Sequence, residues 1–162
     1  MQEKRIPLIV DLDSTLIKTD SLHETIVQFI KNNVFNIFSL IKWYFHGKSY
    51  FKFRLSENII LKPDIFDYRE EVLNLIKREK KKGNKIYLCS GASARQVKLV
   101  FEYLKIFDDY FASTKDINLT REHKAILLTQ RFGKKNYNYV GDSLDDINSW
   151  ENSEKIFSVN IN

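Results

Sequence analysis

Acidic residues follow two of the short apolar segments of this sequence. Asp11 and Asp13 come directly after an apolar run near the N-terminus, and Asp142 and Asp146 follow a second run near the C-terminus. Residues i and i+2 that leave a strand can point to one side, so Asp11 and Asp13 can flank one reacting phosphorus. One carboxylate can then attack while the other handles the proton of the leaving group.

Several carboxylates at one place need a compensating cation. Like charges raise each other's pKa and repel, which costs stability. Hard oxygen ligands of this kind suit Mg²⁺, which often binds through one or two carboxylates and a substrate phosphate. A lone Asp at a strand end more often makes a turn or caps a helix. Two acids at one strand end and more at another favour a magnesium site.

Two further segments carry groups that can bind a phosphate. Ser90 and Gly91 follow the apolar run 85–89, and Lys124 lies in a helical pattern. Ser90 offers a hydroxyl and a backbone N–H to a phosphoryl oxygen. Lys124 would neutralise charge that develops during the reaction. We therefore predict that Ser90, Gly91 and Lys124 bind the substrate phosphate.

Alternating strands and helices are expected to position these residues. Strands are predicted at 6–10, 85–89, 110–113, 137–140 and 156–159, and helices at 67–82, 94–104, 121–132 and 143–150. Such alternation indicates an α/β fold with parallel βαβ units and right-handed crossovers. Ligands of an open parallel sheet bind beyond the carboxyl ends of its strands, where the acids fall.

The first two predicted strands lie far apart in the sequence. Apolar residues recur at helical spacing from 21 to 45, and a further helix is predicted from 49 to about 61. One crossover helix would need far fewer residues. We predict a catalytic core of residues 1–20 and 67–162 and a helical cap of residues 21–66 inserted after the first strand.

Composition limits the compartment and the partners. The chain has 162 residues, a net charge of +5 and one cysteine, which favours a reducing compartment. The basic run 77–82 is typical of a solvated helix end before Gly83, and no nucleic-acid partner is expected. The sequence shows no signal-peptide pattern and no apolar run of membrane-spanning length. We predict a cytoplasmic protein, with the inner face of the membrane as a further expected location.

The candidate catalytic and binding residues occur in the same order as a known set of sequence motifs. Asp11-Leu-Asp13-Ser-Thr-Leu, Ser90, Lys124 and Gly141-Asp142-x-x-x-Asp146 resemble the four motifs of the haloacid-dehalogenase (HAD) superfamily. The first motif is similar to that of its phosphoserine-phosphatase branch. The resemblance covers essentially the whole chain. It implies a Rossmannoid three-layer fold with a small helical cap, and a Mg²⁺-dependent phosphatase.

The resemblance also implies roles for single residues. Asp11 would form a phospho-aspartyl intermediate, and Asp13 would act as acid and then as base. Mg²⁺ would be held by Asp11, the backbone carbonyl of Asp13, Asp142 and Asp146, the last directly or through water. Asp145 is an alternative to Asp146, and Lys134 is an alternative to Lys124.

A narrower resemblance concerns a membrane protein. The segment 11–20, the aromatic cap, Asn118-Leu119 and Arg131-Phe132-Gly133 look like the HAD domain that precedes UbiA-type prenyltransferases in bacterial fusion proteins. It implies a membrane prenyltransferase domain as a partner. The alternative function is then a non-catalytic or regulatory module of such an enzyme.

Two other features have competing interpretations. Cys89 and Arg95 fit the Cys-x5-Arg loop of cysteine-dependent phosphatases, a remote alternative, although a buried strand cysteine is the simpler interpretation. The cap is rich in aromatic residues, which indicates a helical core. Beside its basic residues, the same segment suggests contact with a membrane surface or a lipid-linked phosphate. The substrate expected here is a small metabolite phosphate or a lipid-linked one.

Overall fold

The computed structural model describes residues 5–142 and 146–159. Its strands form one parallel sheet in the order β3-β2-β1-β4-β5. The strands are β1 (Leu8–Val10), β2 (Ile86–Ser93), β3 (Asp109–Ser113), β4 (Asn138–Gly141) and β5 (Ile156–Ser158). The predicted α/β class with a parallel sheet is confirmed. The chain moves outward from β1 through β2 to β3, and β4 then pairs with the other side of β1. Connections therefore diverge between β1 and β4, and open sheets bind ligands at such a switch point.

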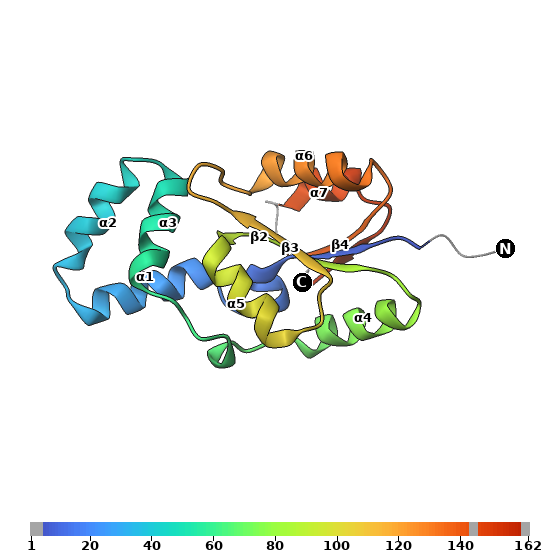
Figure 1. Cartoon of the computed structure of the whole chain (residues 1–162), viewed down its shortest axis with the longest axis horizontal. Coiled ribbons are helices and arrows are strands. Elements are labelled where there is room, and N and C mark those ends of the chain that lie inside the picture. Colours follow the sequence, from blue (N-terminus) through green and yellow to red (C-terminus); the bar gives the residue numbers. More distant parts are fainter. Residues whose placement is uncertain (1–4, 143–145, 160–162) are drawn as a thin grey trace.

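Helices cover both faces of the sheet and give three layers (Figure 1). On one face lie α4 (Glu70–Lys81) and α5 (Ala94–Leu104). On the other lie α6 (Arg121–Phe132) and α7 (Ile147–Asn152).

The alternation of side chains along the strands builds the two cores. Leu8 and Val10 of β1 are buried in one cluster with Val72 of α4 and Val97 of α5. Ile9 points to the opposite face and belongs to a second cluster with Leu128 of α6. Because successive strand residues face opposite sides, a strand covered on both faces must be apolar throughout.

Helices α1 (Ser21–Asn32), α2 (Asn36–Tyr44) and α3 (Lys48–Asn58) follow β1 and its turn, and they form the left end of the molecule in Figure 1. They have their own apolar cluster, built on Phe29, Leu40, Trp43 and Leu55. The predicted helical cap inserted after the first strand is therefore present. Its boundaries at residues 21 and 66 stay a prediction.

The helical pattern predicted over residues 21–45 is interrupted in the structure. Asn33 is extended, with a φ of −161°, and its Oδ1 accepts a hydrogen bond of 3.0 Å from the Phe35 N–H. The Asn36 side chain then donates to the Phe29 carbonyl at the end of α1, at 2.8 Å. Asn side chains compete in this way with the helical hydrogen bonds of the backbone. The prediction of one helical stretch was wrong at this corner.

The chain leaves the core and returns to it at adjacent positions. Lys18 N donates to the Asp67 carbonyl and Arg69 N to the Leu16 carbonyl, each at 2.9 Å. Ile17 and Tyr68 form an antiparallel bridge between these hydrogen bonds. A short 3₁₀ helix, Pro63–Ile65, precedes the returning segment. No helix within residues 5–142 and 146–159 is both long and apolar enough to cross a bilayer.

Candidate active site

Three carboxylates meet at the switch point of the sheet. Oxygens of Asp11, Asp142 and Asp146 all lie within 4.8 Å of one another. Asp11 follows β1, and Asp142 follows β4, which pairs with β1. A cavity of about 290 Å³ opens beside them. Of the predicted site residues, Asp11, Asp13, Gly91, Lys124, Asp142 and Asp146 line this cavity.

The turn after β1 presents the first acid. Leu12–Leu16 forms a distorted π-helical turn in which Ser14 has a φ of 56°, a left-handed conformation that is uncommon for serine. The Thr15 hydroxyl lies 3.2 Å from Asp11 Oδ2 and 3.4 Å from Asp142 Oδ1. Thr15 is buried and holds the acids of two strands together. Its place in the Asp-x-Asp-Ser-Thr segment was the available signal, but no role was predicted for it.

Lys124 of α6 lies among the acids and is only 4% exposed. Its Nζ donates to Asp11 Oδ1 at 2.8 Å and to Asp146 Oδ1 at 3.1 Å. Burial alone would lower the pKa of Lys124, but Asp11, Tyr139 and Asp146 together raise the pKa well above its ordinary value. The ammonium therefore stays charged in the site. The alternative, Lys134, is exposed beyond the end of α6.

Tyr139 and Gly141 of β4 shape the position of Asp146. The Tyr139 hydroxyl donates to Asp146 Oδ1 at 2.7 Å and accepts from Lys124 Nζ at 3.0 Å. A Cβ on Gly141 would overlap Asp146 Oδ2, so only glycine admits this carboxylate. Neither role was predicted from the sequence. Asp145 lies outside the described residues.

Two of the carboxyl groups, those of Asp11 and Asp142, have raised pKa values. Burial, reinforced by Asp146 and Asp13 and opposed by Lys124, raises the pKa of Asp11 to about 7. Burial and the nearby Asp146 also raise the pKa of Asp142. Oδ2 of Asp146 is buried and accepts no hydrogen bond from any described residue. An oxygen without a donor beside two further carboxylates is the chemistry of a divalent-cation site, and the all-oxygen donor set fits Mg²⁺.

Asp13 faces away from this group. Its Oδ1 accepts from the Ser21 N–H at 2.7 Å, and its Oδ2 accepts from the Ser90 hydroxyl at 3.2 Å. Burial raises the pKa of Asp13, and the hydrogen bonds from Ser21 oppose the rise only in part. A carboxyl that keeps its proton more readily suits a general acid. The Asp13 side chain lies between Ser21 of α1 and Ser90, and the metal contact through the Asp13 backbone carbonyl stays a prediction.

Lys52 of α3 also reaches the cavity, and it was not among the predicted site residues. Its Nζ donates to the Gly91 carbonyl at 2.6 Å and to Asn118 Oδ1 at 2.8 Å. Burial lowers the pKa of Lys52, although Asp13 and Asp20 counteract this effect. Gly91 accepts a second bond from the Ser113 hydroxyl at 2.8 Å. A lysine from the inserted helices thus contacts Gly91, one of the predicted phosphate-binding residues.

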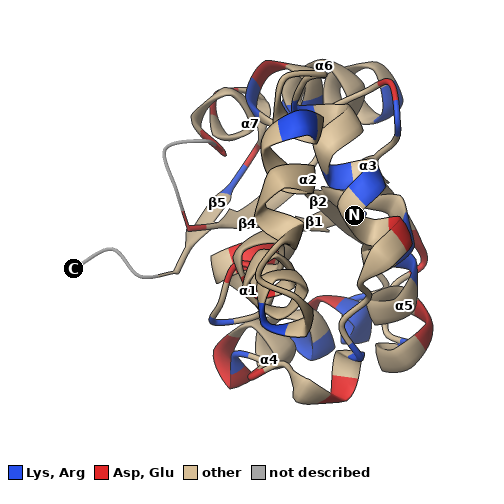
Figure 2. Cartoon of the chain, turned by 90° about the vertical axis from the view of Figure 1, so that its left-hand side faces the viewer, with Lys and Arg blue, Asp and Glu red and all other residues tan. Residues whose placement is uncertain are grey.

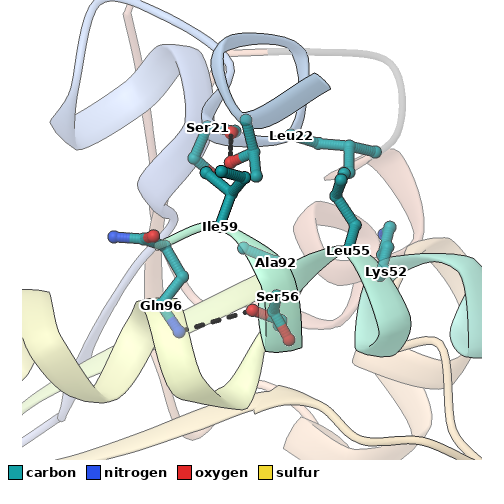
Figure 3. A pocket seen from close by; sticks show the side chains of 10 residues that line it. Ser21, Leu22, Lys52, Leu55, Ser56, Ile59, Ala92 and Gln96 are labelled. Carbon is teal, nitrogen blue, oxygen red and sulfur yellow. Dashed lines mark hydrogen bonds between the residues drawn. The ribbon is translucent and has the colours of Figure 1, made fainter. Parts of the chain in front are cut away.

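A smaller cavity of about 20 Å³ separates α1 and α3 from the start of α5 (Figure 3). Leu22, Leu55 and Ile59 line it on one side, and Ala92 and Gln96 line it on the other. Lys52 lines both cavities. The space is about that of one water molecule, so the inserted helices pack closely against the core beside the acids.

The Cys-x5-Arg alternative does not match the geometry. Cys89 is fully buried in the second core cluster, and burial raises the pKa of its thiol to about 12. Arg95 instead donates to the Ser56 carbonyl of α3 at 3.1 Å. Reactive cysteines have accessible thiols of low pKa, so these observations argue against cysteine chemistry.

A comparison with known sequences finds that the chain is similar to part of a longer protein. No family model matches it. An uncharacterized protein of Sinorhizobium fredii, y4nM, is 32% identical over 149 residues. The match covers 92% of this chain and 29% of that protein, so the chain spans less than a third of the relative's length.

Solved structures share the fold at low sequence identity. A substrate-bound phosphoserine phosphatase matches with a TM-score of 0.67 and 17% identity, over 96% of this chain and 86% of that one. A phospho-aspartyl intermediate analogue of phosphoserine phosphatase gives 0.65 and 20%, over 96% and 87%. A HAD family hydrolase from Salmonella enterica subsp. enterica serovar Typhi gives 0.63 and 18%, over 91% and 61%. The chain has the fold of the HAD hydrolases and phosphoserine phosphatases.

Proposed function

We propose that this chain is a Mg²⁺-dependent phosphomonoester hydrolase that works through a phospho-aspartyl intermediate on Asp11. The main support is the environment of Asp11, a buried carboxylate held by Lys124 and Thr15 beside Asp142 and Asp146. The matched phosphoserine phosphatase with a phospho-aspartyl analogue has the same fold and supports the same chemistry here. Asp11, Asp142 and Asp146 would hold Mg²⁺, which would neutralise phosphoryl charge when bound.

The reaction divides into two displacements. An oxygen of Asp11 attacks phosphorus while the bond to the leaving alkoxide breaks, and Asp13 gives its proton to that alkoxide. Water then attacks the phospho-aspartate, Asp13 takes a proton from it, and inorganic phosphate and the free carboxylate are formed. Lys124 neutralises charge on the phosphoryl oxygens. Ser90, whose hydroxyl donates to Asp13 in the structure, and Gly91 in the last part of β2 would hold the phosphate.

The cavity supports a proposal for the substrate class. Its volume of about 290 Å³ suits a small phosphate ester or the headgroup end of a phosphorylated lipid. Lys52 and Arg121 line it together with Lys124, which favours an ester with a further anionic group.

Hydrolysis of an aryl phosphate tests the proposal. We expect turnover with Mg²⁺ that is lost in EDTA and reduced at least about a thousandfold in Asp11→Asn. Asp116→Asn, at an exposed position, is the matched control, and Cys89→Ala should keep its activity. Turnover that resists EDTA and disappears in Cys89→Ala would contradict the aspartyl mechanism.

The competing function is a non-catalytic or regulatory module of a membrane prenyltransferase, which the narrower sequence resemblance implies. The greater length of the sequence relative is compatible with a module of a larger protein. Fluorine NMR with beryllofluoride, a phosphoryl analogue, distinguishes the two. A Mg²⁺-dependent adduct that Asp11→Asn lacks would support the phosphatase even without aryl phosphate turnover. The absence of both an adduct and turnover would favour the non-catalytic module.

A further inference from the structure

An apolar surface is exposed on α2 and on the turns at its two ends. We name it the α2 surface, and its members are Val34, Phe35, Ile37, Phe38, Ile41, Tyr44 and Phe45. Phe35, Phe38 and Phe45 are 70%, 67% and 82% exposed. Large apolar side chains gathered at one place on a protein surface usually mark a site of interaction.

The side chains on the inner face of α2 already fill the apolar core of the inserted helices. Leu40 and Trp43 are buried, and Trp43 stacks on Phe29 with ring centroids 5.4 Å apart. The members of the α2 surface recur three and four residues apart on the outer side. Packing within the cap therefore does not explain them. The helix lies at the end of the molecule remote from α4 and α7 (Figure 1).

The segment that carries the α2 surface has charges of a single sign. Residues 25–56 contain five Lys and Arg and no Asp or Glu. Of the 26 Lys and Arg in the chain, the other 21 are matched by all 21 Asp and Glu, so the net charge of +5 belongs to this segment. Lys31, Lys42 and Lys48 are exposed and lie within three residues of members of the α2 surface in the sequence. Figure 2 faces this end of the molecule, and α2 carries no acidic residue there.

We propose that the α2 surface docks onto an anionic lipid bilayer. Aromatic and aliphatic side chains would enter the boundary between headgroups and acyl chains, and Lys31, Lys42 and Lys48 would contact lipid phosphates. The nine-residue helix is held from behind by Trp43, so its outer side is presented without further folding.

The charge distribution favours an anionic bilayer over a second copy of the chain as the binding partner of the α2 surface. A symmetric dimer through α2 would place the same basic segment on both sides of the contact. Cations would then face cations, which is unfavourable. Anionic headgroups instead complement Lys31, Lys42 and Lys48, which are exposed.

Co-sedimentation with vesicles tests the docking independently of catalysis. The full chain is mixed with vesicles of phosphatidylcholine alone or with phosphatidylglycerol added. We expect binding to the anionic vesicles and little to the neutral ones. The triple variant Phe35→Ser, Phe38→Ser, Phe45→Ser changes only exposed side chains and should lose most of the binding. Lys42→Glu with Lys48→Glu should weaken vesicle partitioning at least about tenfold.

The controls place equal changes elsewhere. Lys77→Glu with Lys81→Glu reverses two exposed charges on α4 and should leave binding unchanged. Circular dichroism checks that each variant is folded. Wild-type protein that stays in the supernatant with anionic vesicles would overturn the proposal, as would unchanged binding of the triple variant. A dimer in sedimentation velocity that the triple variant abolishes, without vesicle binding, would assign the surface to a second copy.

Discussion

The Tyr139 hydroxyl donates a hydrogen bond of 2.7 Å to Oδ1 of Asp146, and the same hydroxyl accepts one from Lys124. Tyr139 therefore fixes the distance between a cation and an acid without contacting the cavity that a substrate would enter. Oδ2, the other oxygen of Asp146, accepts no hydrogen bond from residues 5–142 and 146–159. In metal sites, mutation of a group that orients a ligand side chain typically lowers metal affinity about 10- to 100-fold.

Tyr139→Phe is expected to lower Mg²⁺ affinity about 10- to 100-fold, because Asp146 loses its orienting donor. Isothermal titration calorimetry measures this. Tyr137→Phe is the matched control, since this buried tyrosine of the preceding segment donates to the Ser149 carbonyl at 3.0 Å. Tyr137→Phe should lose about 1 kcal/mol of stability with its hydrogen bond to Ser149, and Tyr139→Phe should lose more, because its hydroxyl makes two hydrogen bonds. Equal Mg²⁺ affinity in the two would refute the positioning role.

Asp11→Asn is expected to stabilise the metal-free protein. The folded-state pKa of Asp11 is about 7 and its ordinary value is 3.8, so ionisation costs stability above neutral pH, and this cost fades as the pH falls toward 3.8. In EDTA near pH 8, the variant should melt a few degrees above wild type, and the difference should shrink near pH 5. Differential scanning calorimetry of the variant and the wild type at both pH values measures this difference in melting temperature. A variant that melts below wild type at high pH would mean that the pair with Lys124 outweighs burial.

Lys52→Met tests whether the inserted helices contact the substrate, and it rests on the proposed phosphatase activity. We expect KM for a doubly anionic ester to rise about tenfold or more, because a charge-assisted contact is lost, while KM for an uncharged aryl ester changes less. Lys48→Met, one turn earlier on α3 and exposed, is the control. Similar KM changes for both esters would make Lys52 a structural link to Gly91 only.

Lys105→Gly should stabilise the fold. Lys105 ends α5 with a φ of 53°, a left-handed conformation that glycine adopts without cost. We expect a gain of about 0.5–1 kcal/mol, or a few degrees in Tm. Lys98→Gly within α5 should instead cost about 1 kcal/mol. Thermal melting of the two variants in opposite directions would establish the effect, and a lower Tm for Lys105→Gly would exclude it.

Local signals carried most of the fold. The predicted helices 94–104 and 121–132 match α5 and α6 in both bounds. At α5, the Ser93 side chain accepts from the Gln96 N–H, an N-cap that is visible in the sequence. The corner at Asn33 was missed, because one side-chain hydrogen bond to the backbone outweighed a continuous apolar pattern.

The site residues also differ in how well the sequence predicts them. Acids that follow β1 and β4 were predictable, since the ends of parallel strands meet at one edge of a sheet. Tyr139 was not, because a strand covered on both faces gives no pattern that says which side chain turns toward the acids. Lys52 lies 39 residues before Gly91, and only the packing of α3 brings the two together.

The concentration of the whole net charge in residues 25–56 has a mechanical consequence. A body whose excess charge lies at one end experiences a torque in the field of a charged surface, as well as an attraction. Within about a Debye length, roughly 8 Å at physiological salt, this chain would rotate before it touches and arrive with α2 first. The protein would thus be oriented before it contacts the surface. Fewer encounters would begin at the rest of the molecule, where positive and negative charges are equal in number.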